Sequence, residues 1–191
     1  MQQRRGGQKR AFSVQQIQAL ENLLLNSPSP RRRFLERALL RLAVDSMLRA
    51  SDLLKLTVGD VLFEGKVREQ VELRQQKTGV PHVVSLSEKT CAALSVYILM
   101  CKPRSLELRL FPFRIRAYQD VVKRWAKMLQ LDPRFYSSHS LRRTKAKLIY
   151  DRTQNIEVVR QLLGQSSIES TRYYLGVELE DAHRVAREIE I

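Results

Sequence analysis

The chain has 191 residues, a size that suits one compact domain, and its 34 lysines and arginines against 20 aspartates and glutamates give a formal net charge of +14. This charge favours a polyanionic partner, either nucleic acid or an anionic membrane surface, although a merely basic protein has the same composition. No apolar run approaches the roughly 20 residues that a membrane-spanning helix needs, and no apolar segment follows the basic N-terminus as a secretory signal requires. Cys91 and Cys101 stand in no metal-ligand pattern and the three histidines are scattered, so we expect reduced thiols, an intracellular protein and no metal site.

The first third of the chain is predicted to be helical. Residues 1–12 are polar and basic, which indicates a flexible arm. Ser13 is expected to cap a helix with apolar residues at helical spacing, and the segment 26–33 is expected to break it. A second helix leads into "DSMLRASDLLKLTVGDV", where Ser51 or Asp52 is expected to cap a further short helix.

The apolar period changes to alternation between residues 62 and 86, where β-branched residues are also frequent. Gly79 and Pro81 predict a turn between two strands, because glycine allows positive φ and proline fixes its own φ. From Ser87, an expected N-cap, the chain is predicted to be helical to its end, with two short helices hinged at Gly164. The predicted fold class is therefore α+β, mainly helical with one small antiparallel sheet of two or three strands.

The stretch "SSHSLRRTKAKLIYD" begins one of these helices. If Ser138 caps it, His139 and Arg142 share a face near the helix N-terminus. The free N–H groups and the positive dipole at that end suit an oxyanion. The alternative is a solvated basic helix start.

Two further cations have both a functional and an ordinary interpretation. Arg49 is a single charge between two apolar segments, where a salt bridge to Asp52 is the ordinary expectation. Lys77 lies at the tip of the predicted hairpin, where lysine is common because the site is wet. A lysine at that position can also reach into a groove as a flexible donor.

The segment "LLGQSSIESTRYYLG" joins two short helices, an arrangement that also fits a helix-turn-helix whose second helix contacts DNA. It ends in Tyr173 and Tyr174, and paired tyrosines near a chain end are usually core or interface residues. Cleaving a DNA phosphodiester without a metal requires cations on the non-bridging oxygens, a proton donor for the leaving 5′ oxygen, a proton acceptor and a nucleophile. Two arginines, a lysine, a histidine and a tyrosine supply these groups, and the cations also help a hydroxyl with a pKa of about 10 to attack near pH 7.

In their order, these segments resemble the catalytic domain of tyrosine recombinases, the phage-integrase family. "MLRASDLLKLTVGDV" is similar to the family's first-arginine motif, "QQKTGVPHVVSLS" to its lysine hairpin, "HSLRRT" to its His-x-x-Arg box, and "LLGQSSIESTRYY" to the segment before the nucleophile. In the family the nucleophilic tyrosine lies nine positions after a histidine that Gln165 replaces here, which indicates Tyr174 rather than Tyr173. The catalytic residues that the resemblance implies are Arg49, Lys77, His139, Arg142, Gln165 and Tyr174.

The resemblance also implies a fold and a reaction. It implies a helical domain with a small sheet, a 3′-phosphotyrosyl intermediate, a free 5′ hydroxyl, and strand exchange without ATP, metal or other cofactor. The implied partner is double-stranded DNA, bound by a homotetramer at the nucleoid. The residues expected to contact DNA are Arg31, Arg32, Arg33, Arg143, Lys145 and Arg172.

The chain departs from the family pattern in two ways. Glutamine at position 165 donates a hydrogen bond but does not titrate, so we expect reduced or retuned activity. Larger members carry an N-terminal helical domain that clamps DNA, whereas only residues 1–12 precede the predicted catalytic domain, 13–176. The chain is then a minimal recombinase, a fragment, or dependent on a partner.

The last segment, 177–191, predicts an amphipathic helix with an apolar stripe. It is expected either to dock on a neighbouring protomer or to fold back on its own core. Two other functions remain open for the whole chain. One is a nicking and closing activity like that of type IB topoisomerases, and the other is a DNA-binding regulator that uses residues 155–175 as a helix-turn-helix without cleavage.

Overall fold

A computed structural model of the chain describes residues 9–176. Their contacts define two compact units, which we call unit 1, ending at Lys145, and unit 2, beginning at Ala146. The catalytic domain predicted over residues 13–176 therefore comprises both units. Helix α7 (Ser138–Thr153) is continuous across the boundary.

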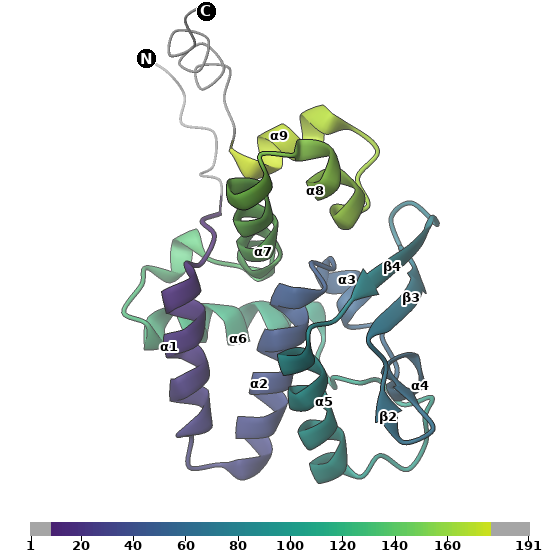
Figure 1. Cartoon of the computed structure of the whole chain (residues 1–191). Coiled ribbons are helices and arrows are strands. Elements are labelled where there is room, and N and C mark those ends of the chain that lie inside the picture. The colour runs from purple at the N-terminus through teal and green to yellow at the C-terminus, as the bar shows by residue number, and fades with distance from the viewer. Residues whose placement is uncertain (1–8, 177–191) are drawn as a thin grey trace, which may run out of the picture. The chain divides into compact units, whose positions relative to one another are not determined.

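Unit 1 is built around a group of packed helices. Its longer helices are α1 (Val14–Leu25), α2 (Pro30–Asp45), α5 (Glu88–Cys101) and α6 (Ile115–Met128). Helix α2 packs between α1 and α5, and α6 contacts α1 (Figure 1). The largest fully buried side chains include Trp125, Tyr118 and Phe111, so aromatic residues from α6 and the loop before it fill the centre of this core.

The short elements of unit 1 lie between α2 and α5 in the chain, except for one 3₁₀ turn. They are α3 (Ala50–Leu53), α4 (Val58–Val61), β1 (Leu62–Phe63), β2 (Lys66–Val67), β3 (Gln70–Arg74), β4 (Pro81–Ser85) and η1 (Pro133–Phe135). The strands form two antiparallel pairs, β1–β2 and β3–β4, rather than one sheet. The predicted fold class, α+β and mainly helical, is confirmed, whereas the single sheet that was expected is two separate strand pairs.

The predicted turn chemistry is present in the β3–β4 hairpin. Leu73 pairs with His82 near its end, and Gly79 has a φ of +69°, a conformation that L side chains rarely adopt. The turn that carries Lys77 is therefore shaped by this glycine. Figure 1 shows the hairpin projecting as a ribbon from the helices of unit 1.

Several predicted helix boundaries need correction. Ser13 caps α1 as expected, with a capping box to Gln16. The second helix starts inside the segment predicted to break the first, because Pro30 suits the first helical position. Neither Ser51 nor Asp52 caps α3, whose N-cap residue is Arg49.

The start of α7 is also shifted by one residue from the prediction. The Ser137 hydroxyl accepts a hydrogen bond from the His139 N–H at 3.3 Å, and the Ser140 hydroxyl accepts one from the Ser137 N–H at 3.1 Å. Ser137 is therefore the capping residue, and Ser138 is the first residue of the helix.

Unit 2 consists of the end of α7 and two short helices, α8 (Ile156–Leu163) and α9 (Ile168–Leu175). Asn155 and Ser167 cap these helices through their side chains. Gly164 ends α8 in the left-handed conformation with a φ of +57°, which confirms the predicted hinge. Helices α8 and α9 pack against each other with Leu163 and Leu175 buried.

The predicted terminal segments are only partly described. Residues 9–12 belong to unit 1 rather than to an arm, because Phe12 is buried and its N–H donates to the Thr144 hydroxyl at 3.0 Å. Residues 1–8 and the predicted C-terminal helix at 177–191 lie outside the described residues. Within residues 9–176, no helix is long and apolar enough to cross a membrane, and no group of His, Cys, Asp and Glu residues is arranged to hold a metal ion.

Candidate active site

Arg49 lies at the end of a tight turn between α2 and α3. The Ser46 hydroxyl donates to the Leu42 carbonyl at 2.7 Å, and Met47 adopts a φ of +50°, which reverses the chain after α2. The Arg49 side chain is 21% exposed, and its Nη1 donates to Gln75 Oε1 at 2.7 Å. Its Nη1 is 3.9 Å from Asp52 Oδ2, so the ion pair expected from the sequence is present but is the longer of the two contacts.

The turn of the β3–β4 hairpin presents Lys77 beside α3. Two backbone hydrogen bonds close the turn, from Gln75 N to Val80 O at 3.1 Å and from Gly79 N to Gln75 O at 2.8 Å. The Gln76 N–H donates to Asp52 Oδ1 at 2.8 Å, which fixes the turn to α3. Lys77 itself is exposed.

The N-terminal part of α7 supplies the other two candidates in unit 1, His139 and Arg142. Arg142 is buried, and its Nη1 donates to the carbonyl of Met47, two residues before Arg49. Desolvation, together with the positive charges of Arg142, Arg49 and Arg143, lowers the pKa of His139 below its ordinary value of 6.5. His139 is therefore neutral at pH 7 and has a ring nitrogen that accepts a proton.

Four of the six predicted catalytic residues thus come from three distant segments of the sequence and meet in unit 1. Hydrogen bonds join the segment around Arg49 to the hairpin and to α7. The charges of both Arg142 and Arg49 lower the pKa of His139. This part of unit 1 concentrates planar guanidinium groups beside a neutral imidazole, an arrangement suited to an oxyanion that must also exchange a proton.

The remaining two candidates, Gln165 and Tyr174, belong to unit 2. The backbone of Gln165 bonds twice to Arg160, through Arg160 Nη1 to the Gln165 carbonyl at 2.6 Å and through Gln165 N to the Arg160 carbonyl at 3.0 Å. The Thr171 hydroxyl donates to Gln165 Oε1 at 2.7 Å, which orients the side-chain amide. Gln165 is therefore held firmly in the α8–α9 turn.

Helix α9 carries both tyrosines in its last turn. Successive helical residues point about 100° apart, so Tyr173 and Tyr174 do not share a face. Tyr173 is 76% exposed, whereas Tyr174 is half-buried. Both residues have interactions with other groups.

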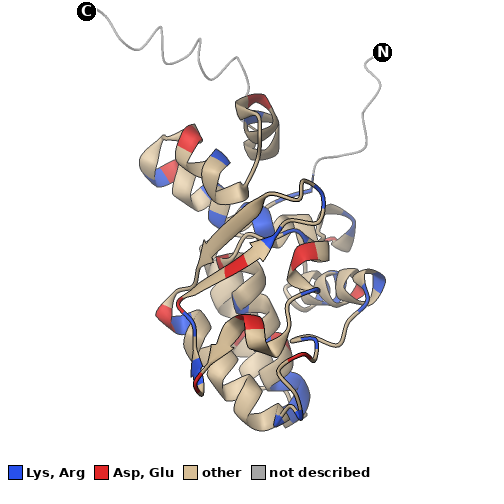
Figure 2. Ribbon diagram, turned by 90° about the vertical axis from the view of Figure 1, so that its right-hand side faces the viewer, with Lys and Arg blue, Asp and Glu red and all other residues tan. Residues whose placement is uncertain are grey.

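Most of the residues predicted to contact DNA have partners within the fold. Arg32 pairs with Glu36 at 2.6 Å, and Arg33 Nη2 donates to the Ser27 carbonyl at 2.7 Å. The other positions are exposed Arg31, half-buried Arg172, Arg143 bonded to the carbonyl of Lys9, and Lys145 paired with Asp45. Figure 2 shows that lysine and arginine are spread over many elements rather than gathered on one helix.

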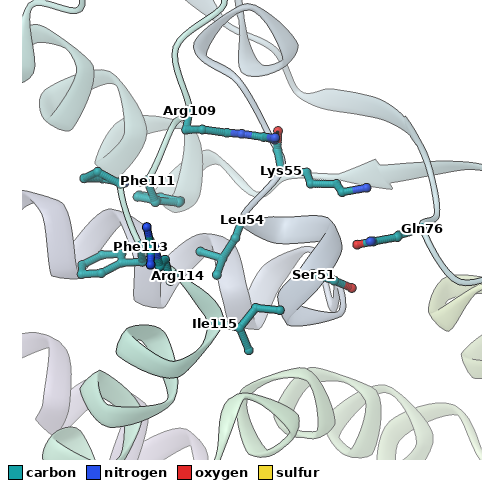
Figure 3. A pocket seen from close by; sticks show the side chains of 10 residues that line it. Ser51, Leu54, Lys55, Gln76, Arg109, Phe111, Phe113, Arg114 and Ile115 are labelled. Atoms are coloured by element: carbon teal, nitrogen blue, oxygen red, sulfur yellow. The ribbon is translucent and has the colours of Figure 1, made fainter.

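A basic pocket of about 450 Å³ lies next to the hairpin turn in unit 1 and was not found by sequence reasoning. Its cationic lining residues are Lys55, Arg109 and Arg114, and its apolar lining includes Leu54 and Phe111. Figure 3 shows the Arg109 side chain reaching toward Lys55, whose backbone carbonyl accepts its hydrogen bond. These residues carry no motif, because they are brought together only by the packing of α3 against the loop before α6.

The family model of the phage integrase family matches residues 12–180. The chain therefore belongs to this family of tyrosine recombinases.

Among curated proteins, the chain is 30% identical over 150 residues to tyrosine recombinase XerA of Saccharolobus solfataricus, an alignment that covers 78% of this chain and 48% of that protein. It is 28% identical over 182 residues to the probable integrase/recombinase YoeC of Bacillus subtilis, with 93% of each chain covered. The chain thus spans about half the length of the Xer-type relatives and nearly the full length of YoeC.

The same fold occurs in solved structures. The XerH site-specific recombinase bound to its difH substrate, in a pre-cleavage complex, matches 97% of this chain with a TM-score of 0.74 and 17% identity, over 55% of the XerH chain. The catalytic domain of bacteriophage HP1 integrase matches 94% of this chain and 95% of its own, with a TM-score of 0.64 and 20% identity.

Proposed function

We propose that this chain is a site-specific DNA recombinase that cleaves and rejoins DNA through a 3′-phosphotyrosyl intermediate, with Tyr174 as the nucleophile. The observation that carries the proposal is the meeting of Arg49, the Lys77 turn, His139 and Arg142 in unit 1. Membership of the family and the names of its curated relatives support the same reaction class.

In the proposed cleavage step, the Tyr174 hydroxyl oxygen attacks the scissile phosphorus and the bond from phosphorus to the 5′ oxygen breaks. The phenol proton passes to the neutral imidazole of His139, and Lys77 donates a proton to the leaving 5′ oxygen. Arg49 and Arg142 bind the non-bridging oxygens, on which charge accumulates in the transition state. Rejoining reverses these transfers with a 5′ hydroxyl from a second strand, and the phosphotyrosyl bond conserves the energy of the original linkage.

Gln165 is proposed to add one hydrogen bond to the scissile phosphate. Its Oε1 is occupied by the Thr171 hydroxyl, which leaves the Nε2 hydrogens as the donors for a phosphate oxygen. Because an amide does not titrate, this contact is independent of pH, unlike the contact of a histidine.

Double-stranded DNA is the proposed substrate, bound by a tetramer in which two sites are paired. The net charge of +14 supports a polyanionic substrate. The pocket lined by Lys55, Arg109 and Arg114 is a further candidate for phosphate contacts, because all three side chains are exposed, whereas Arg143 is buried and Lys145 is paired with Asp45.

The proposal is tested with nicked duplexes that tile the DNA flanking the chain's own gene. Each nick is placed just 3′ of a candidate scissile phosphate, so that the short fragment with the free 5′ hydroxyl is lost and the protein stays attached. After denaturation, a covalent protein–DNA band is expected for the wild-type chain and for Tyr173→Phe, but not for Tyr174→Phe.

The variants and the nicked duplexes separate the alternatives. Loss of the band in Tyr173→Phe alone would move the nucleophile to that residue. A band shift under native conditions without any covalent product would favour a DNA-binding regulator. Gln165 is the feature of the sequence that favours this alternative. Relaxation of supercoiled DNA without joining of two duplexes would favour a topoisomerase-like activity.

A further inference from the structure

Gln75 begins the segment that resembles the family's lysine hairpin, but the resemblance assigns it no role. It is buried at the end of β3, and its side-chain oxygen accepts two hydrogen bonds, from Arg49 Nη1 at 2.7 Å and from the Thr78 hydroxyl at 3.1 Å. Its backbone N–H and C=O also close the turn that carries Lys77. One residue therefore contacts the guanidinium expected to bind the phosphate and shapes the loop of the expected proton donor.

The hydrogen bonding around Gln75 is incomplete. Gln75 Nε2 and Asp52 Oδ2 are buried and have no hydrogen-bond partner among residues 9–176. Both atoms belong to side chains that contact Arg49. Nearly all buried polar groups in proteins have a partner, so these two atoms set the surroundings of Arg49 apart from the other side-chain hydrogen bonds of unit 1.

The neutrality of this side chain also matters. A carboxylate at position 75 would pair with Arg49 and compete with the phosphate for its positive charge. An amide oxygen orients the guanidinium without neutralising it, and Arg49 keeps further N–H groups for the phosphate oxygens.

We propose that Gln75 is a positioning residue that couples Arg49 to the Lys77 turn, so that phosphate binding and protonation of the leaving group are set by one hydrogen-bonded cluster. The inference rests on the proposed function. It predicts that loss of the Gln75 side chain impairs both catalytic groups, although Gln75 touches neither the substrate nor the reacting atoms.

The test compares two forms of the nicked duplex on which the wild-type chain forms its covalent adduct. In one, the bridging 5′ atom at the scissile phosphate is oxygen. In the other it is sulfur, whose thiolate leaves without a proton because a thiol is much more acidic than an alcohol. Single-turnover cleavage of each duplex is measured for Gln75→Ala, Gln75→Glu and Thr78→Val.

We expect Gln75→Ala to cleave the oxygen duplex about 100-fold more slowly than the wild type, the loss typical of a misplaced catalytic group. The loss on the sulfur duplex should be clearly smaller, because the contribution through Lys77 is bypassed while the contribution through Arg49 remains. Thr78→Val removes a single hydroxyl from an exposed turn residue and should show the same pattern at about 10-fold. Gln75→Glu should be impaired on both duplexes, because its charge neutralises Arg49.

The matched control is Gln70→Ala, which removes an exposed glutamine side chain from β3, the strand that leads to Gln75, and should leave both rates unchanged. The inference would be overturned if Gln75→Ala and Thr78→Val cleaved both duplexes as fast as this control. Equal losses on the two duplexes would also overturn it, because a general structural defect is not relieved by a better leaving group. If the wild-type chain forms no adduct with any duplex, the proposed function fails. If the wild-type chain is active and the variants cleave at the same rate, only the inference about Gln75 fails.

Discussion

Two clusters in unit 1 combine arginine with a buried acidic residue, but they differ in how completely their polar atoms are hydrogen-bonded. Around buried Glu36, one carboxylate oxygen accepts from Arg32 and Arg124 at 2.6 Å each, and the other accepts from Trp125 Nε1 at 2.7 Å. Around Arg49, the ion pair with Asp52 is 3.9 Å long, and two buried polar atoms lack hydrogen-bond partners among the described residues.

The difference indicates separate tasks. The Arg49 cluster keeps buried polar atoms that no group among the described residues satisfies, as expected of a site that binds a ligand. The Glu36 cluster joins α2 to α6 and is fully satisfied, as expected of a group that holds the core together. Composition does not distinguish the two clusters, but the completeness of their hydrogen bonding does.

The largest expected effect is on catalysis, from Arg49→Lys. Lysine keeps the charge but lacks the planar fork that bonds to Gln75 and that, in the proposed mechanism, also binds phosphate oxygens. We expect the single-turnover rate of covalent adduct formation to fall by about 10²–10³-fold, as for loss of a transition-state donor. The free energy of unfolding in urea should change by less than about 1 kcal/mol. A loss of stability that accounts for the lost activity would erase the contrast between the clusters.

The converse effect is expected from Glu36→Ala. It leaves two arginines and a buried indole N–H without their acceptor and should lower the free energy of unfolding by about 3 kcal/mol. This is the lower end of the range for a broken buried pair, because Arg32 and Arg124 reach solvent. Urea unfolding measures the loss, and cleavage per folded molecule should be unchanged.

The control for this variant is Asp151→Ala, which breaks the exposed pair with Lys147 and should cost no more than about 0.5 kcal/mol. Equal losses in the two variants would mean that burial of the Glu36 cluster contributes nothing.

The sequence predicted local structure and the identity of the candidate residues, but not the contacts between distant side chains. The helices, the hinge at Gly164 and the hairpin turn follow from local rules, since spacing, capping residues and glycine act within a few positions. The roles of Arg49, Lys77, His139 and Arg142 came from the family resemblance and its ordered motifs. Their convergence in unit 1 agrees with that assignment, whereas their catalytic roles remain a proposal.

The contacts between side chains that are far apart in the sequence were not predictable from local patterns or from the family resemblance. Gln75 and Lys145 are ordinary polar residues in the sequence, and their contacts with Arg49 and Asp45 span 26 and 100 positions. Lys145 was predicted to contact DNA. Only the packing of α7 against the end of α2 reveals its ion pair with Asp45. Sequence patterns report local geometry, whereas these pairings depend on tertiary structure.

A smaller effect is expected in the acid stability of the satisfied cluster. Burial alone would raise the pKa of Glu36, but hydrogen bonds from Trp125, Arg124 and Arg32 outweigh it and hold the pKa below 4.5. A carboxyl with a depressed folded-state pKa stabilises the protein above its unfolded value, and this contribution disappears as the pH falls through the folded value. The urea midpoint should therefore begin to decline below about pH 4.5.

Glu36→Gln removes this titration and should make the decline shallower without abolishing it. Glu157 still titrates, because hydrogen bonds from Arg160 and Gln161 lower its pKa, and so does Asp45, whose bonds to Lys145 and Ser87 lower its pKa against the effect of burial. An unchanged pH profile in Glu36→Gln would assign the acid sensitivity to other carboxyls.

The smallest expected effect is on the pKa of His139, which the positive charge of Arg49 helps to lower. In the DNA-free protein, an NMR titration of the imidazole, assigned with His139→Asn, should show a midpoint below 6.5. Arg49→Gln removes one of the neighbouring positive charges and should raise that midpoint, because the imidazolium becomes less unfavourable. Arg124→Gln removes an equal charge from the Glu36 cluster, which is not among the charges that lower the pKa of His139. An equal rise in both variants would mean that His139 responds to the net charge of unit 1 rather than to the arginines of the candidate site.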